Sequence, residues 1–263
     1  MRFALALAAV AALVAPVAAQ TPGTVFLEDL TWVEVRDAVN AGTTTILIPT
    51  GGTEQNGPHM VLGKHNFLVK YKACEIAKRL GKTLVAPVIA YVPEGEINPP
   101  TSHMRFAGTI TTPPEIFAKV LEYAARSFKQ HGFRDIAFLG DSGGNQASQK
   151  QVAEALNKEW AGTPVRVHHM SDYYPGRGDD WLKEQGVSAE VVGGHASIHD
   201  TASLLVLNPS MLRISKARLG KEGDGSGVVG DPSKSTVEYG KQILEMQIED
   251  ASRHLRLLRE TKR

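Results

Sequence analysis

The sequence predicts an α/β protein, in which helices cover both faces of a mostly parallel β-sheet. Two observations lead to this expectation. Short runs of β-branched and apolar residues alternate along the chain with longer stretches whose apolar residues recur at helical spacing. Several of the helical stretches also begin at a proline or end at a glycine, which are signals of helix ends. Strands that alternate with helices are typical of parallel sheets.

The first half of the chain contains two predicted strands and two predicted helices. TTILIP (44–49) has the composition of a strand, and FLVKYKACEIAKRLG (67–81) that of a helix ending at a glycine C-cap. TLVAPVIAYV (83–92) is expected to be the second strand. The helix predicted over 113–132 begins with prolines, repeats apolar residues on one face and ends at Gly132.

The second half continues the alternation. DIAFLGD (135–141) and VRVHHM (165–170) are predicted strands, separated by a helix over QASQKQVAEALNKEWAG (146–162). Two further helices are predicted, over 197–208 and 236–260.

Residues 1–19, MRFALALAAVAALVAPVAA, have the layout of a secretory signal, with an arginine near the start, an apolar run and small residues before Gln20. The run is short for a membrane span, and no basic cluster follows it. We therefore expect cleavage after Ala19, a periplasmic or secreted mature protein, and no membrane attachment. No repeat or linker divides residues 20–263, which we expect to form a single domain.

Without the first 19 residues the charges balance, with 28 basic and 28 acidic side chains. No basic stripe is present in the sequence, which argues against nucleic acid as a partner. The whole chain is 42% hydrophobic, enough to bury a full core in one domain.

A polar cluster follows each predicted strand. The four clusters are TGGTEQNGPH, PEGEINPPTSHMRF, GDSGGNQ and SDYYPGRGDD. Because ligands of open parallel sheets bind at the carboxyl ends of the strands, we expect one site at that edge.

The first cluster and the residues after it supply Glu54, His59 and His65. Carboxylate oxygens and imidazole nitrogens are ligands of zinc and similar divalent metals, so these residues are candidate metal ligands. In a second interpretation, His59, which follows Gly-Pro, braces the loop by bonding backbone groups.

The third cluster forms a turn between a strand and a helix. Gly143 and Gly144 permit close approach of the backbone, whose N–H groups can hold an anion or oxyanion. Asp141 can be a ligand or a base, while Asp141 or Ser142 can equally cap the helix. A nucleophilic Ser142 is disfavoured, because DSGG is not the G-x-S-x-G elbow.

GGHASIHDT (193–201) supplies His195, His199 and Asp200. If this stretch is helical, the two histidines share one face. Two imidazoles near a carboxylate can ligate a metal or transfer protons, although His199 can also be a solvated surface residue.

In order along the chain, five segments resemble motifs of the creatininase family, the creatinine amidohydrolase-like hydrolases. GGTEQNGPHMVLGKH resembles G-x-x-E-Q-H-G-P-H-L-P-L-x-x-D, HMRFAGTITTP resembles H-x-x-F-P-G-T-x-S, and GDSGGN resembles N-G-H-G-G-N. GGHASIHDTASLLVLNP resembles G-x-H-A-G-x-x-E-T-S-x-x-L-x-x-x-P, and GVVGDPSKSTVEYGKQIL resembles the closing G-D-P-x-x-A-T-x-x-G segment. The resemblance runs from about residue 27 to 250.

The resemblance implies a three-layer α/β/α fold, a homo-oligomer, and a two-metal site that hydrolyses a C–N amide bond. By position, Glu54 matches a metal-binding glutamate of the family. Asn56 stands at a family histidine, and His65 at the family's bridging aspartate. Asp200 stands at the E-T-S glutamate. His195 is kept, and the family uses it for proton transfer near the scissile bond.

The third motif departs from the family as well, because Ser142 replaces its histidine and follows Asp141. On this resemblance, the pocket around the substrate would include residues of the first three clusters: Asn56, His59, His103, Arg105, Ser142, Gly143, Gly144 and Asn145. Arginine in such a pocket would suit a carboxylate-bearing substrate.

These departures fall on the metal ligands. A two-metal centre usually needs a bridging carboxylate, which a histidine cannot replace. We therefore expect one zinc or manganese ion per chain, bound by Glu54 and His65 and completed by Asp141 or Asp200.

On this interpretation the protein is a metal-dependent amidohydrolase that cleaves an amide bond of a small, possibly cyclic, substrate with metal-activated water and His195. The alternative is a non-catalytic periplasmic protein that binds a small molecule on the same fold. Loss of the family histidines at Asn56 and Ser142 favours the alternative, whereas His65 and Asp141 favour the enzyme.

Overall fold

Four parallel strands form the central sheet, in the spatial order β2-β1-β3-β4. The structure is a computed structural model that describes residues 23–174 and 176–261. The strands are β1 (Thr45–Thr50), β2 (Thr83–Val85), β3 (Asp135–Gly140) and β4 (Arg166–His169). The expected α/β fold with a parallel sheet is confirmed. The expected signal segment, residues 1–19, lies outside the described residues, and export stays a prediction.

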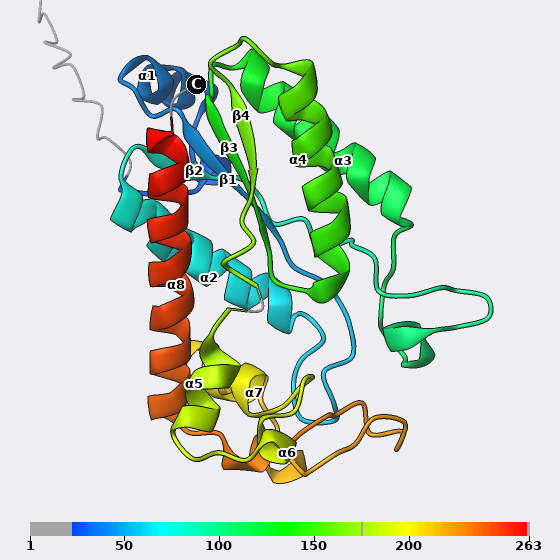
Figure 1. The fold of residues 1–263 in the computed structure, drawn as a ribbon. Coiled ribbons are helices and arrows are strands. Elements are labelled where there is room, and N and C mark those ends of the chain that lie inside the picture. Colours follow the sequence, from blue (N-terminus) through cyan, green and yellow to red (C-terminus); the bar gives the residue numbers. More distant parts are fainter. Residues whose placement is uncertain (1–22, 175, 262–263) are drawn as a thin grey trace, which may run out of the picture.

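Helices cover both faces of the sheet and complete the three layers (Figure 1). α3 (Pro114–Gln130) and α4 (Gln146–Glu159) pack on one face. α2 (Lys64–Leu80) and α8 (Val237–Glu260) pack on the other face. Each of these four helices lies within two or three residues of its predicted bounds. None of the helices in the described part of the chain is long and apolar enough to cross a lipid bilayer.

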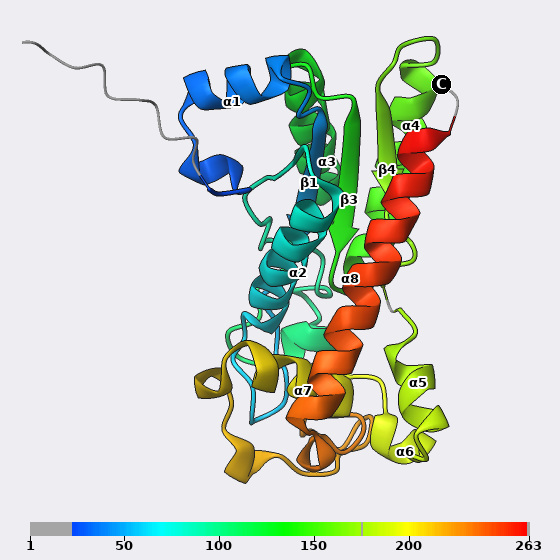
Figure 2. The same cartoon turned by 90° about the vertical axis from the view of Figure 1, so that its left-hand side faces the viewer.

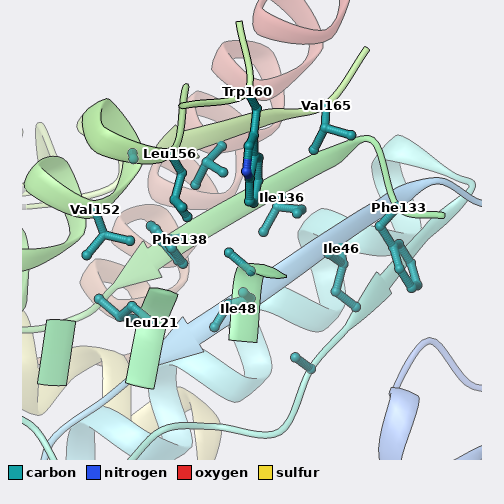
Figure 3. Close-up of a cluster of buried hydrophobic side chains, with 14 of the residues drawn as sticks. Ile46, Ile48, Leu121, Phe133, Ile136, Phe138, Val152, Leu156, Trp160 and Val165 are labelled. Carbon is teal, nitrogen blue, oxygen red and sulfur yellow. The ribbon is translucent and has the colours of Figure 1, made fainter. Parts of the chain in front are cut away.

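The alternation of side chains along β1 and β3 divides the core between these two faces. One set of strand residues packs with α3 and α4 (Figure 3): Ile46, Ile48, Ile136 and Phe138. The residues between them point the other way and pack with α2 and α8: Leu47, Ala137 and Leu139. Strands that are buried on both faces have continuous apolar sequences, so TTILIP and DIAFLG can be identified as strands from the sequence. Each fully buried isoleucine or phenylalanine here contributes roughly 2 kcal/mol of transfer free energy.

The second strand is shorter than predicted. The expectation of a strand over 83–92 is wrong beyond Val85, where the β2 ladder ends. Pro87 has no N–H group and cannot donate to a ladder, so regular pairing stops before it. Ile89 regains a single bridge to Thr50, and the chain then continues as a loop.

Helices not predicted from the sequence are α1, α5 and α6. α1 (Trp32–Asn40) begins with a capping box, in which Thr31 and Glu34 satisfy each other's backbone N–H groups. α5 (Gly178–Glu184) and α6 (Ala189–Val192) are short, and their apolar residues are too few to make a helical pattern.

The strands point toward the end of the molecule that carries α5, α6 and α7 (Ile198–Leu207) (Figure 2). Because β2 and β3 lie on opposite sides of β1, the connections after β1 and β3 leave the sheet beside each other. Such a point of reversal is where open α/β sheets bind their ligands.

Candidate active site

A cavity of about 120 Å³ lies at the carboxyl ends of the strands. It is lined by residues from the connections after β1, β3 and β4, from α2, and from the segment that leads into α7. The side chains that carry its chemistry are Glu54, Lys64, His65, Lys72, Asp141, Ser142, Tyr174, Asp179, His195, His199 and Asp200. The expectation that the polar clusters meet at one edge is confirmed for these connections.

Two asparagine side chains, Asn66 from α2 and Asn56 from the connection after β1, hold the loop that carries Glu54. The Asn66 carbonyl oxygen Oδ1 accepts from the Gly52 backbone N–H at 3.0 Å. A side chain at Gly51 would collide with Asn66, so this close approach requires glycine. Asn56 Nδ2 donates to the Glu54 backbone oxygen at 3.0 Å, across the turn. Asn56 therefore shapes the loop that presents Glu54.

His65 lies between two buried carboxylates. Its Nε2 is 2.8 Å from Glu54 Oε1, and its Nδ1 is 3.0 Å from Asp141 Oδ2. Burial and the Lys64 charge lower the pKa of His65, but Glu54 and Asp141 outweigh them, and the net pKa is raised. A protonated imidazole donates from both nitrogens, as these contacts require. Both His65 nitrogens are therefore already engaged by the protein.

Asp141 also binds a buried lysine. Lys72 Nζ lies 2.5 Å from Asp141 Oδ1, and the Tyr173 hydroxyl donates to the same oxygen. Burial raises the pKa of Asp141, but Lys72 and His65 outweigh it and lower the pKa to about 2. Asp141 is therefore ionised at neutral pH and accepts from three side chains.

Asp200 forms the corresponding pair with Lys64. Lys64 Nζ lies 3.0 Å from Asp200 Oδ1, and the lysine side chain is only 1% exposed. The second oxygen, Oδ2, accepts from the Ala196 backbone N–H at 2.9 Å. Ala196 has a φ of 51°, a strained conformation for a residue with a Cβ, directly after His195. Asp200 thus holds the turn that positions His195.

Glu54, His103 and His195 form a group whose ligand atoms all lie within 4.8 Å of one another. His103 Nε2 is 3.2 Å from Glu54 Oε2. The Gln55 amide nitrogen lies 3.0 Å from His103 Nδ1 and 3.0 Å from His195 Nε2 and so holds both rings. One carboxylate and two imidazoles match the donors of open zinc sites, so this group can hold one ion.

The protonation states suit such a group. Burial, more than any other cause, lowers the pKa of His195 to about 4 and also lowers that of His103, so both imidazoles are neutral at pH 7. Burial alone would raise the pKa of Glu54, but His65 outweighs it, and the Glu54 pKa lies well below its usual range. Burial and the Glu54 charge raise the pKa of Glu94 to about 10, so Glu94 is protonated beside ionised Glu54.

The four residues predicted to bind metal all line the cavity, namely Glu54, His65, Asp141 and Asp200. His65, however, is hydrogen-bonded to both Glu54 and Asp141. Asp141 and Asp200 are in addition paired with buried lysines. Their role as a ligand set stays a prediction, and the contacts favour Glu54 with His103 and His195. The sequence predicts His103 as a pocket residue and His195 as the residue that transfers a proton.

The other predicted pocket residues divide into two groups. Ser142 lines the cavity, and the exposed Gly143 approaches the Tyr174 hydroxyl, which also lines it. The remaining residues are not among those that line the cavity: Asn56, His59, His103, Arg105, Gly144 and Asn145.

Two of these residues make buried polar contacts. His59 is fully buried, and its Nε2 lies 2.9 Å from the side-chain Oγ1 of Thr201, not from the backbone groups that the second interpretation expected. Asn145 Nδ2 donates to Thr50 Oγ1 at 2.8 Å and to the Gly51 oxygen at 2.9 Å, and so ties the end of β3 to that of β1. Arg105 is exposed.

Lys64, Lys72, Gln55 and Glu94 were not identified from the sequence. Lys64 adjoins His65, and Lys72 lies two helical turns beyond Lys64 on the same face of α2, so helical spacing could have linked them. Lysine is rarely buried, and the sequence shows no partner nearby. Their carboxylate partners are more than 60 residues away in the chain.

The sequence of the chain matches a known protein family. Residues 28–255 match the family model described as Creatininase, creatinine amidohydrolase. The chain is 29% identical over 222 residues to the mycofactocin precursor peptide peptidase of Mycobacterium tuberculosis H37Rv, covering 80% of this chain and 84% of the relative. It is 27% identical over 205 residues to the creatinine amidohydrolase of Pseudomonas putida, covering 73% and 75%.

Solved structures show the same fold. A crystal structure of creatinine amidohydrolase superposes with a TM-score of 0.77 at 19% identity, covering 91% of this chain and all of the other. Two further creatininase structures, described as a Zn-Zn type and as a manganese form, have TM-scores of 0.75 and 0.72 at 20% and 19% identity and each cover 90% of this chain and 99% of their own.

Proposed function

Because the chain belongs to the creatininase family, we propose that it is a hydrolase that cleaves a carbon–nitrogen amide bond of a small substrate with the help of one metal ion. The observation that carries the proposal is the group of Glu54, His103 and His195. Relatives named as a peptide peptidase and a creatinine amidohydrolase support the reaction class. The cavity of about 120 Å³ supports a small reacting group.

Glu54, His103 and His195 would hold the ion, zinc or manganese. Their fit rests on the donor set, in which one ionised carboxylate and two neutral imidazoles place their ligand atoms within 4.8 Å of one another. A bound ion of this kind makes a water molecule acidic and polarises a carbonyl group.

The chain's own residues prepare the site. Gln55 fixes the two imidazole rings, and Asp200 fixes the turn at Ala196 beside His195. Hydroxyl groups of Ser142 and Tyr174 line the cavity and can hydrogen-bond a substrate.

A single ion is proposed because the protein supplies its own cations to the other carboxylates. Lys72 and His65 contact Asp141, and Lys64 contacts Asp200. A second divalent ion at either carboxylate would have to displace or oppose these charges, at a considerable electrostatic cost.

Elemental analysis of protein purified without chelators tests the proposal. We expect about one ion per chain, lost in Glu54→Gln and in His103→Ala. The matched control is His199→Ala, because His199 lines the same cavity but lies outside the ligand group. Two ions per chain, or full retention of metal in Glu54→Gln, would overturn this ligand set.

His195→Ala separates the two roles considered for His195. Loss of metal in this variant identifies His195 as a ligand. Retained metal with lost turnover, in a screen of short peptides, creatinine and other small amides, identifies the proton-transfer role predicted from the sequence.

One observation favours the alternative of a small-molecule-binding protein. The cavity carboxylates are charge-compensated by lysine and histidine, so the site is electrically complete without an ion. Absence of metal, even after incubation with excess zinc or manganese, together with no turnover, would support this alternative.

We also propose that the mature protein is exported and forms a homo-oligomer. The proposal of export rests on residues 1–19. Exposed apolar side chains on one face of α3 support association: Ile116, Val120 and Tyr123. Light scattering of the purified protein gives its mass in solution, and a monomer would contradict the second proposal.

A further inference from the structure

Lys64 is a buried cation of the proposed active site. It is the first residue of α2, and its side chain lines the same cavity as Glu54, His195 and Ser142. Placing an ammonium group out of water costs several kcal/mol unless it is paired, and Asp200 provides that pair at 3.0 Å. The ion pair explains how Lys64 is tolerated, and its place in the cavity wall brings it within reach of a ligand.

Comparison with Lys72 shows what is particular to Lys64. The Lys72 ammonium contacts Asp141 and Gln247 Oε1 and lies 4.7 Å from the centre of the Tyr173 ring. Lys72 is therefore enclosed by protein groups. The Lys64 ammonium instead contacts one oxygen of Asp200.

An ammonium group has three N–H donors. Lys64 can therefore bind an oxygen atom in the cavity while it keeps its ion pair with Asp200. Asp200 in turn is held by the Ala196 backbone N–H, so the pair has a fixed position relative to His195.

We propose that Lys64 binds the carbonyl oxygen of the substrate, on which negative charge develops during amide hydrolysis. Its ammonium group would be the second cation of the site, in addition to the ion that Glu54, His103 and His195 would hold. The assignment rests on the proposed hydrolase function. A preorganised cation at this oxygen stabilises the tetrahedral intermediate because water is largely excluded from the site. The carboxylate product would occupy the same position, so the ligand class is a small carboxylate or amide.

The test compares Asp200→Asn with the double variant Lys64→Met/Asp200→Asn. Both carry asparagine at 200, so neither contains an unpaired carboxylate there, and they differ in the Lys64 ammonium alone. The probe is trifluoroacetate, a small carboxylate, and its binding to the zinc-incubated protein is followed by fluorine NMR. Thermal unfolding and zinc content are measured on the same samples.

We expect Asp200→Asn to bind trifluoroacetate at least as tightly as the wild type, because its Lys64 charge is no longer compensated. The double variant should bind at least about tenfold more weakly at equal zinc content. Its melting temperature should be no lower than that of Asp200→Asn, because it contains no unpaired lysine. Equal affinity in the two variants would overturn the proposal and leave Lys64 as the structural partner of Asp200.

The single variant Lys64→Met addresses stability separately. If Lys64 has only a structural role, adding Asp200→Asn to Lys64→Met should restore both the stability and the binding that the single variant lost. Our proposal predicts that Asp200→Asn restores stability but not binding. Absence of zinc from the wild type would overturn the metal-dependent function, whereas the binding comparison still decides the role of Lys64.

Discussion

The ammonium nitrogen of Lys72 lies 2.5 Å from Oδ1 of Asp141, and both side chains are almost completely buried. The pair joins the middle of α2 to the residue that follows β3, in the wall of the cavity. Removing one member of a buried pair leaves the other charge unpaired, which is far more costly than losing a surface ion pair.

Asp141→Asn should therefore lower the free energy of unfolding by about 3–5 kcal/mol at pH 7. Denaturant unfolding measures this change. Asp37→Asn provides the control, because Asp37 and its partner Arg36 are more than half exposed, and a loss below about 1 kcal/mol is expected there. Equal effects of the two substitutions would contradict the structural role given to Asp141.

The same carboxylate should make stability depend on pH. The pKa of Asp141 is lowered to about 2 in the folded protein, against an ordinary value of 3.8. Its stabilisation is thus fully present above pH 4 and is lost as the pH falls through about 2, with a total of about 2 kcal/mol. The stability difference between wild type and Asp141→Asn should shrink by up to that amount between pH 5 and pH 2, and a constant difference would refute the assignment.

Two adjacent glycines should respond differently to alanine. A Cβ at Gly144 would lie 2.3 Å from the Pro93 backbone oxygen, whereas a Cβ at Gly143 would meet the Tyr174 hydroxyl at 3.6 Å, an ordinary contact. Gly144→Ala should cost about 1–3 kcal/mol of unfolding free energy, because a backbone segment must move. Gly143→Ala is the matched control and should cost less than about 1 kcal/mol. Thermal unfolding of the two variants checks this order.

Cleavage after Ala19 predicts the N-terminus of the mature protein. Mass spectrometry of protein isolated from the periplasm or the medium should give a chain that begins at Gln20. A chain that keeps Met1, or that stays in the cytoplasm, would show that residues 1–19 are not a cleaved signal. Expression of residues 20–263 alone provides the control, and it should remain inside the cell.

Local patterns in the sequence were sufficient to predict the sheet and its main helices. β1 and β3 are buried on both faces, so their apolar runs are unbroken, and α3 carries a proline at its start and a glycine after its end. Where such signals were absent the prediction was incomplete. α1 went unrecognised although Thr31 and Glu34 have the spacing of a capping box, because the helix is short and none of its residues is fully buried. The second strand was predicted to continue past Pro87, where its ladder does not extend.

The parallel α/β architecture, the family, and the edge of the sheet at which Glu54, Asp141 and His195 meet can be predicted from the order of the amino acids. The partners of these residues depend on contacts between distant parts of the folded chain. Lys64 and Asp200 are more than 130 residues apart, and Lys72 and Asp141 nearly 70, so no local pattern pairs them. They meet because α2 packs across the strands and carries two lysines toward the cavity. Burial then makes each ion pair important for stability, because an unpaired charge there would cost a large share of the free energy of folding.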